Sequence, residues 1–304
     1  MISDPPRIPS IDGLRGVLAA YIVVFHAACC AGFDVPLSTG ALTVGVFFII
    51  SGYVLTPRWQ GNYPAFLIRR FLRLWPVYAV CLIAGALIVG VKLTWTDFAF
   101  YPVFPSAAAF QADGPVWSLY VEAWAMLAIP FIVWSGKTLP RVIVGVFVWG
   151  VLGHFEFRFG NGALFTLGSY LSRYRFDVTA LNWRVPQWLG KVSYSLYLTH
   201  AVVYAAFAKF FPGVNVLLTI PLAFLGGYLV WASVERYSIN LSRRAATIVT
   251  RGSAVRGLAQ VAAPILVLRF RFDRRNEPPW EDGKGTHCGR SPNALSASSR
   301  QPER

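Results

Sequence analysis

The sequence predicts an all-α fold: a polytopic bundle of about eight transmembrane helices with both termini in the cytoplasm. Of the 304 residues, 55% are hydrophobic and only 14% are charged, whereas soluble domains carry roughly 25% charged residues. Much of the apolar content falls in blocks that are long enough to cross a hydrocarbon core of ~30 Å. Most of the charged residues lie between these blocks. The lipid bilayer is therefore the first partner that we expect.

Eight apolar blocks are candidate spans. The fifth and the sixth are short, nearer in length to buried or re-entrant segments than to full spans. The approximate limits, in chain order, are Ile11–Ala31, Ala41–Thr56, Trp75–Val91, Val116–Trp134, Val142–Gly153, Gly162–Leu171, Trp188–Phe207 and Val214–Val234. Residues 1–250 are accordingly predicted to form one transmembrane domain.

The distribution of Lys and Arg predicts the orientation. With a cytoplasmic N-terminus, 15 of these residues fall in the inside segments up to Arg256, and three (Lys92, Arg158 and Lys209) fall outside. Positive residues concentrate in the cytoplasmic connections of membrane proteins. The split therefore predicts an even number of crossings. It does not test the two short spans, because removing both of them keeps the parity.

The chain changes character after the last span. The short apolar segment Leu258–Phe270 is flanked by arginines, so residues 251–270 are predicted to be a basic segment with an interfacial helix. Residues 271–304 are rich in Arg, Pro, Gly, Ser and Asn. Such a composition cannot bury enough apolar area to fold, and we expect a disordered tail.

Charge and cysteine content argue against other classes of protein. A formal net charge of +14 would suggest nucleic-acid binding in a soluble protein. Here the sidedness of the basic residues accounts for the charge, and no nucleic-acid partner is expected. Cys29, Cys30, Cys81 and Cys288 form neither a disulfide pattern nor a metal-ligand spacing with the scattered histidines. We therefore expect no metal site.

Four ionisable side chains inside the spans are the candidate functional groups, because such groups are costly in a membrane. They are Arg15 and His26 in the first span, Glu122 in the fourth and His200 in the seventh. Arg15 and His26 are eleven residues apart, which places them on one helix face about 16 Å apart along the axis. Arg15 then lies near the cytoplasm, and His26 lies nearer the outer surface.

The depth of Glu122 matches that of His26. Counted from the outer ends of their spans, Glu122 lies ~9 Å deep and His26 ~8 Å deep. A carboxylate beside an imidazole fixes its tautomer and raises its basicity, which predicts a His26–Glu122 pair, with His200 as a second candidate. A structural alternative stays open for each residue. A membrane histidine can be a helix–helix hydrogen-bonding group, and Glu122 can pair with a buried Arg or Trp N–H.

A basic cluster of Arg69, Arg70 and Arg73 lies on the inside, between the second and third spans. Arg70 and Arg73 share a helix face and could bind a phosphorylated cofactor through charge-assisted contacts. The ordinary excess of positive residues on the inside is the alternative explanation. Glu235, at the inner end of the last span, is predicted to form a structural ion pair with Arg15, with a catalytic role for Glu235 as the alternative.

Six motifs in order resemble the membrane-bound acyltransferase-3 family, bacterial O-acyltransferases of surface glycans. The resemblance covers about Pro9 to Arg244. The motifs are IPSIDGLRGVLAAYIVVFHA with Arg15 and His26, VGVFFIISGYVLT with Ser51, FLIRRFLRLWPVY with Arg70 and Arg73, VWSLYVEAWAML with Trp117, Ser118 and Glu122, GKVSYSLYLTHAVV with His200, and VERYSINLSRR with Glu235.

The resemblance implies a function and a site. Acetyl-CoA or another acyl-CoA would be the donor on the cytoplasmic side, with no tightly bound cofactor. The acceptor would be a hydroxyl of a cell-surface glycan or glycolipid, and the location would be the bacterial inner membrane. The implied catalytic residues are His26 and Glu122. The implied donor-binding residues are Arg15, Arg70 and Arg73. The implied site-lining residues are Ser51, Trp117, Ser118 and His200.

The chain also departs from the family pattern. The region Ser135–Pro186 is compressed, with fewer spans than the family usually has, and Gly45 stands where an acidic residue is common. The closing Glu235 and Arg236 are followed by Tyr and Ser and not by Pro. Two other readings therefore stay open: a degraded, non-catalytic member, and a transporter that uses the buried Arg, His and Glu as a relay. The oligomeric state is not predicted.

Overall fold

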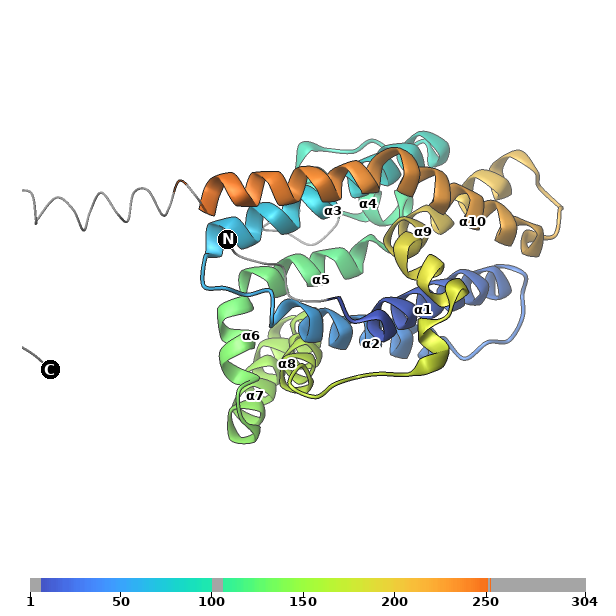
Figure 1. Ribbon diagram of the computed structural model, residues 1–304. Helices are drawn as coiled ribbons and strands as arrows, with labels where there is room; N and C mark the ends of the chain where they lie inside the picture. The colour runs from blue at the N-terminus through green and yellow to red at the C-terminus, as the bar shows by residue number, and fades with distance from the viewer. Residues whose placement is uncertain (1–6, 100–105, 251, 253–304) are drawn as a thin grey trace, which may run out of the picture. The chain divides into compact units, whose positions relative to one another are not determined.

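The computed structural model describes residues 7–99, 106–250 and 252, and within these ranges it contains helices, turns and loops but no strand. Ten α-helices occur in the described part (Figure 1). Their bounds are Pro9–Cys30 (α1), Leu37–Leu55 (α2), Tyr63–Val89 (α3), Ala107–Ala112 (α4), Val116–Leu127 (α5), Ile129–Ser135 (α6), Leu139–Phe155 (α7), Gly162–Leu171 (α8), Arg184–Phe210 (α9) and Thr219–Val230 (α10). The predicted all-α class is confirmed. The predicted interfacial helix and the tail lie outside the described residues.

Short 3-10 helices complete the connections. Their bounds are Trp95–Phe98, Phe157–Asn161, Thr179–Asn182 and Val216–Leu218. After α10 the chain passes through a π turn, Trp231–Glu235, and stays helical to Thr250. The last helix is therefore much longer than the predicted eighth span.

Four helices of the described chain are long and apolar enough to cross a membrane: α1, α2, α3 and the helix Val216–Thr250, which contains α10. The pair α5 and α6 would make a fifth. Helix α9 has 27 residues, but its buried side chains include Ser193, Ser195, Thr199 and His200, and these lower its hydropathy. The chain is thus a membrane protein by its helices, while the number of about eight spans and the location of the termini stay predictions.

Helix α3 begins twelve residues before the predicted third span. The Asn62 side chain accepts a hydrogen bond from the Ala65 backbone N–H at 3.1 Å, which caps the helix. The arginines of the basic cluster therefore lie on the helix and not in a connecting loop. Arg and Leu are good helix formers, so the charges that shortened the predicted span do not end the helix.

The predicted fourth span is not one continuous helix in the structure. It is two helices, α5 and α6, which meet at Ala128 with a bend of 74°. Pro130 lies in the first turn of α6, where its missing N–H and its ring disfavour a continuous helix through the preceding turn. The chain is redirected there, and only α5 contributes to the site described below.

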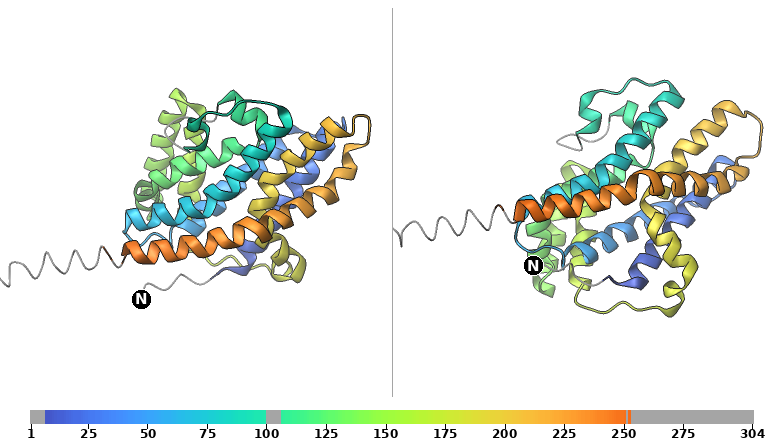
Figure 2. Two further views of the ribbon diagram at one scale, coloured as in Figure 1. Left: turned by 90° about the horizontal axis from the view of Figure 1, so that it is seen from above. Right: turned by 45° about the horizontal axis from the view of Figure 1, so that its top comes forward.

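Helix α9 packs against α1, α3 and α10 (Figure 2). Glycines allow its close approach to α1. A Cβ on Gly16 would collide with the backbone of Gly190, and one on Gly190 would collide with the backbone of Asp12. Small residues permit such backbone contact between membrane helices. This contact sets the position of α9 along α1, and with it the pairing of their histidines.

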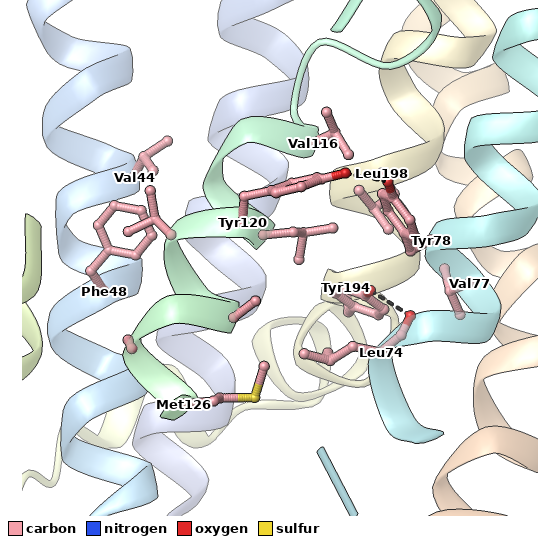
Figure 3. Packing of buried hydrophobic residues seen from close by; sticks show 14 of the residues in the cluster. Val44, Phe48, Leu74, Val77, Tyr78, Val116, Tyr120, Met126, Tyr194 and Leu198 are labelled. Carbon is pink, nitrogen blue, oxygen red and sulfur yellow. Dashed lines mark hydrogen bonds between the residues drawn. The ribbon is translucent and has the colours of Figure 1, made fainter. Parts of the chain in front are cut away.

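The largest buried cluster lies between α2, α3, α5 and α9 (Figure 3). The hydroxyl groups of three of its tyrosines form hydrogen bonds with backbone carbonyls. Tyr78 and Tyr120 both donate to the backbone carbonyl of Asp97, and Tyr194 donates to the carbonyl of Leu74 at 2.7 Å. Buried tyrosine hydroxyls need such partners. The bonds attach the connection after α3 to the core, and they attach α9 to α3.

Candidate active site

Two histidines from α1 and α9 face each other in the interior. His26 Nδ1 lies 3.0 Å from His200 Nε2, and the rings are stacked with centroids 5.1 Å apart. His200 is 1% exposed. One of these two nitrogens must carry the proton of the hydrogen bond, so the pair restricts the tautomers of both rings. With that proton on His26 Nδ1, the Nε2 atom of His26 is a free base.

The two histidines lie on the wall of a cavity of about 460 Å³. We call this cavity the histidine chamber. Its wall also contains Trp117, Tyr197 and Tyr204, together with aliphatic residues of α1, α2 and α9. The volume lies within the ~300–1,000 Å³ that is usual for small-molecule sites. The predicted site residues His26, Trp117 and His200 thus come together here.

A smaller cavity of about 50 Å³ lies toward the N-terminal end of α1. We call it the arginine chamber. The predicted residues on its wall are Arg15, Ser51, Ser118 and Glu122. Its polar and charged wall suits a polar or anionic group, in contrast to the mainly apolar histidine chamber.

The two chambers adjoin. Val44 and Tyr197 lie on the walls of both. The Tyr197 hydroxyl lies 2.9 Å from Ser118 Oγ, within hydrogen-bond distance, and this bond links α9 to α5. Ser118 Oγ also donates to the Pro115 carbonyl at 3.0 Å. A hydrogen-bonded wall therefore separates the arginine chamber from the histidine chamber.

The predicted pairing of Glu122 with His26 is wrong. Glu122 forms an ion pair with Arg70 of α3, and the two side chains are 17% and 13% exposed. Glu122 lines the arginine chamber, whereas His26 lines the other one. The reason is the longer α3, whose added turns carry Arg70 to the carboxylate. The structural alternative, a buried arginine as partner of Glu122, is what the structure contains.

The predicted ion pair between Glu235 and Arg15 is also not formed. The Glu235 carboxylate instead accepts hydrogen bonds from the Ser195 hydroxyl at 2.6 Å and from the Ser195 backbone N–H at 3.3 Å. The π turn at Trp231–Glu235 turns this side chain toward α9. Arg15 thereby stays on the wall of the arginine chamber.

The arginines of α1 and α3 form one electrostatic cluster. Arg15, Arg70 and Arg73 lie close enough for their charges to interact, although they come from segments more than fifty residues apart. Glu122 and Glu235 balance the cluster only in part. Such a concentration of buried guanidinium groups favours an anionic ligand with several phosphate oxygens.

Two residues of the site region were not predicted. Tyr197 lies three residues before His200 on α9, so helical spacing from a candidate histidine could have indicated it. Asp113 precedes α5 and is 1% exposed, and neither of its carboxylate oxygens has a hydrogen-bond partner among the described residues. Burial raises the pKa of the Asp113 carboxyl well above its usual range. Asp113 precedes Gly114 and Pro115, a sequence typical of a turn, so no sequence signal marks it as a site residue.

Comparison with known proteins identifies the family of this chain. The acyltransferase domain family matches residues 8–185, which is more than half of the chain. The chain belongs to this acyltransferase family. The family predicted from the motifs is thereby confirmed. The matched range includes the predicted donor-binding arginines, His26 and Glu122. It ends at residue 185, before His200.

Three curated proteins are similar to parts of this acyltransferase chain. Protein 2 in the picA locus of Rhizobium radiobacter is 40% identical over 87 residues, 26% of the chain and 44% of that protein. Acyltransferase MdmB of Streptomyces mycarofaciens is 35% identical over 135 residues, 40% of the chain and 33% of that protein. Peptidoglycan O-acetyltransferase OatA of Listeria monocytogenes is 25% identical over 174 residues, 46% of the chain and 27% of that protein.

The chain therefore spans less than half the length of each of these relatives. No solved structure matches it.

Proposed function

We propose that this membrane protein is an O-acyltransferase that moves an acetyl group, or another short acyl group, from acyl-CoA to a hydroxyl. The observation that carries the proposal is the hydrogen-bonded pair of His26 and His200, on the wall of a chamber that adjoins a cationic one. The first chamber presents a base, and the arginine cluster beside the second supplies cationic groups for an anionic donor.

His26 acts as the general base. With its Nδ1 proton donated to His200, its Nε2 accepts the proton of the acceptor hydroxyl while that oxygen attacks the thioester carbonyl. The new C–O bond forms and the C–S bond breaks, and the imidazolium returns the proton to the thiolate that leaves. His200 holds the tautomer of His26, a task that a carboxylate performs in other acyl-transfer sites.

The arginine cluster binds the donor. Arg15, Arg70 and Arg73 supply cationic groups for the phosphates of CoA, and CoA is a substrate rather than a tightly bound cofactor. Glu122 holds Arg70 in place and does not touch the imidazole. Ser51 and Ser118, on the wall of the arginine chamber, are positioned to contact the thioester end of the donor.

The acceptor binds in the histidine chamber, beside the base. The motifs resemble those of enzymes of surface glycans, and the Listeria relative is named a peptidoglycan O-acetyltransferase. A hydroxyl of a glycan or glycolipid at the bacterial inner membrane is the acceptor class that these resemblances favour.

A transfer assay tests the proposal. The full chain in lipid nanodiscs is supplied with labelled acetyl-CoA and candidate hydroxyl acceptors. His26→Ala should lower the transfer rate by about 10²–10⁴-fold, as is usual for loss of a general base. His200→Gln should also lower it, because the tautomer of His26 is no longer fixed. His154→Ala, which removes an exposed histidine of α7, is the matched control. Undiminished transfer by His26→Ala would remove His26 from the mechanism.

Donor binding separates the enzyme from a transporter. Saturating CoA should raise the unfolding temperature of the wild-type protein, because a ligand that binds the folded state stabilises it. Arg73→Ala should reduce this shift. A transporter that uses the buried charges as a relay has no reason to bind CoA, and a degraded member would bind CoA without transferring the acyl group.

A further inference from the structure

The histidine chamber differs from the arginine chamber in the kind of molecule that it can hold. None of the described residues on its wall is Asp, Glu, Lys, Arg, Asn or Gln. Charged groups gather instead in the arginine chamber, where Arg15 and Glu122 lie. The aromatic side chains on the wall of the histidine chamber are Phe25, Phe110, Trp117, Tyr197 and Tyr204.

Both tyrosine hydroxyls on this wall, and one ring nitrogen of each histidine, already have partners. His26 Nδ1 and His200 Nε2 are bound to each other, and the Tyr197 hydroxyl is bound across the wall between the chambers. Tyr204 donates its hydroxyl proton to the backbone carbonyl of Val23 at 2.7 Å. A ligand in the chamber therefore meets few polar groups that can change partner at low cost.

Four side-chain groups on the described wall remain without a hydrogen-bond partner: His26 Nε2, the indole N–H of Trp117, the weakly polar Cys30 thiol and the buried His200 Nδ1. These few groups suffice for a single reactive hydroxyl. They do not suffice for a sugar ring, which brings several more hydroxyls into the same space. Each buried hydroxyl without a partner weakens binding by roughly 10-fold.

The entrance of the chamber is apolar as well. Leu37, at the start of α2, is 77% exposed, and Phe110 of α4 is 53% exposed, and both line the chamber. An acceptor that passes these side chains comes from the lipid phase at lower cost than from water, because its apolar surface stays out of water throughout.

We infer that the acceptor carries its reactive hydroxyl on an uncharged, mainly apolar skeleton with few other hydroxyls. This inference rests on the proposed function, since it assigns the acceptor of the same site. The chamber volume of about 460 Å³ accommodates a ring system of small-molecule size. A uronate or phosphate would bury its charge against a wall without a counter-charge, which is strongly unfavourable.

Matched acceptors test the inference. The full chain in nanodiscs, with labelled acetyl-CoA, is offered menthol, methyl glucoside or methyl glucuronoside. These probes are an apolar ring with one hydroxyl, a ring with several hydroxyls and a charged ring. We expect kcat/KM for menthol to exceed that for methyl glucoside by about 10-fold or more, with methyl glucuronoside the poorest. Equal or better use of methyl glucoside would overturn the inference.

A variant of the wall provides a second, internal test. Ala201 lies next to His200 on the chamber wall, so Ala201→Asn adds an amide donor and acceptor there. The ratio of kcat/KM for menthol to kcat/KM for methyl glucoside should fall by about 5-fold or more. Ala206→Asn, on the same helix α9 but not on the wall, should leave the preference unchanged. An unchanged preference in Ala201→Asn would contradict a preference set by this wall.

CoA release, acylation of menthol and stabilisation by CoA together distinguish a wrong acceptor class from a wrong proposed function. If CoA release depends on His26 but menthol is not acylated, the acceptor class is wrong and the donor reaction stands. If neither CoA release nor stabilisation by CoA occurs, the proposed function is wrong, and the inference about its acceptor is overturned with it.

Discussion

At the scale of single residues, Tyr197 connects the two halves of the proposed reaction. It lines both chambers, and its hydroxyl closes the wall between them through Ser118 at 2.9 Å. In the proposed reaction, the donor thioester and the acceptor hydroxyl beside His26 must meet across this wall. We therefore expect the hydrogen bond to limit contact between the donor and acceptor spaces.

Tyr197→Phe and Ser118→Ala each remove this bond. The chambers then communicate more readily, so hydrolysis of acetyl-CoA without acceptor should rise about 5-fold relative to transfer, equivalent to roughly 1 kcal/mol. CoA release with and without acceptor measures the ratio. The double variant should show the same ratio as either single variant, because both substitutions remove the same interaction.

Tyr228→Phe is the control, because it replaces a half-exposed tyrosine of α10. An unchanged ratio in both single variants would show that the wall does not depend on this bond.

Asp113 is the second residue with a measurable consequence. Burial raises the pKa of its carboxyl well above the usual range. A carboxyl with a raised pKa in the folded state destabilises the fold once the pH exceeds its unfolded pKa of about 3.9. Asp113→Asn should therefore raise the stability by about 1–2 kcal/mol near pH 7, and the gain should vanish as the pH falls toward that unfolded pKa.

Thermal unfolding of wild type and Asp113→Asn across this pH range measures the effect. Asp34→Asn, which removes an exposed carboxylate between α1 and α2, should change the stability little at any pH. A loss of stability in Asp113→Asn at neutral pH would mean that the folded protein stabilises the charged carboxylate.

At the scale of elements, the contact between α1 and α9 positions the histidine pair. Gly16 lies at a point of close approach, because any Cβ there meets the backbone of Gly190. Gly16→Ala should therefore lower the free energy of unfolding by about 1–3 kcal/mol through overpacking. It should also lower the transfer rate, since the two imidazoles are displaced from each other.

Gly150→Ala is the matched control on α7. A Cβ at Gly150 meets nothing within 4 Å, so the substitution should raise helix stability by about 0.5–1 kcal/mol. Thermal unfolding in the same detergent compares the two variants. A Gly16→Ala protein as stable and active as the wild type would mean that α1 and α9 can separate without harm to the site.

At the scale of the whole molecule, the orientation in the membrane can be measured with native cysteines. Cys29 and Cys30 lie at the end of α1 beyond His26, half-buried and exposed respectively, and Cys81 is 2% exposed. With the predicted cytoplasmic N-terminus, a membrane-impermeant maleimide should label Cys29 and Cys30 in intact cells. Cys81 should stay unlabelled.

The double variant Cys29→Ser, Cys30→Ser is the control for this labelling, and it should abolish the signal from intact cells. Cys288 lies outside the described residues, in the predicted cytoplasmic tail, and should react only after the cells are made permeable. Labelling of Cys29 and Cys30 only after permeabilisation would reverse the predicted orientation.

Several features of this protein were accessible from its sequence alone. The apolar blocks predicted the helices α1, α2, α7 and α8 nearly to their ends, because the length of an apolar run is a local property. The spacing of Arg15 and His26 placed them correctly at different levels of one helix. The motifs identified the family. Each of these inferences needs only one segment of chain at a time.

The partners of the site residues were decided by the tertiary structure. Helix geometry gives the depth of Glu122 and of His26 along their own axes, but it does not say which helix lies beside each of them. That choice depends on close contacts such as Gly16 with Gly190 and on the added turns of α3, which carry Arg70 to Glu122. His26 therefore pairs with His200 and not with the carboxylate, because packing between distant segments selects among groups that sequence spacing cannot distinguish.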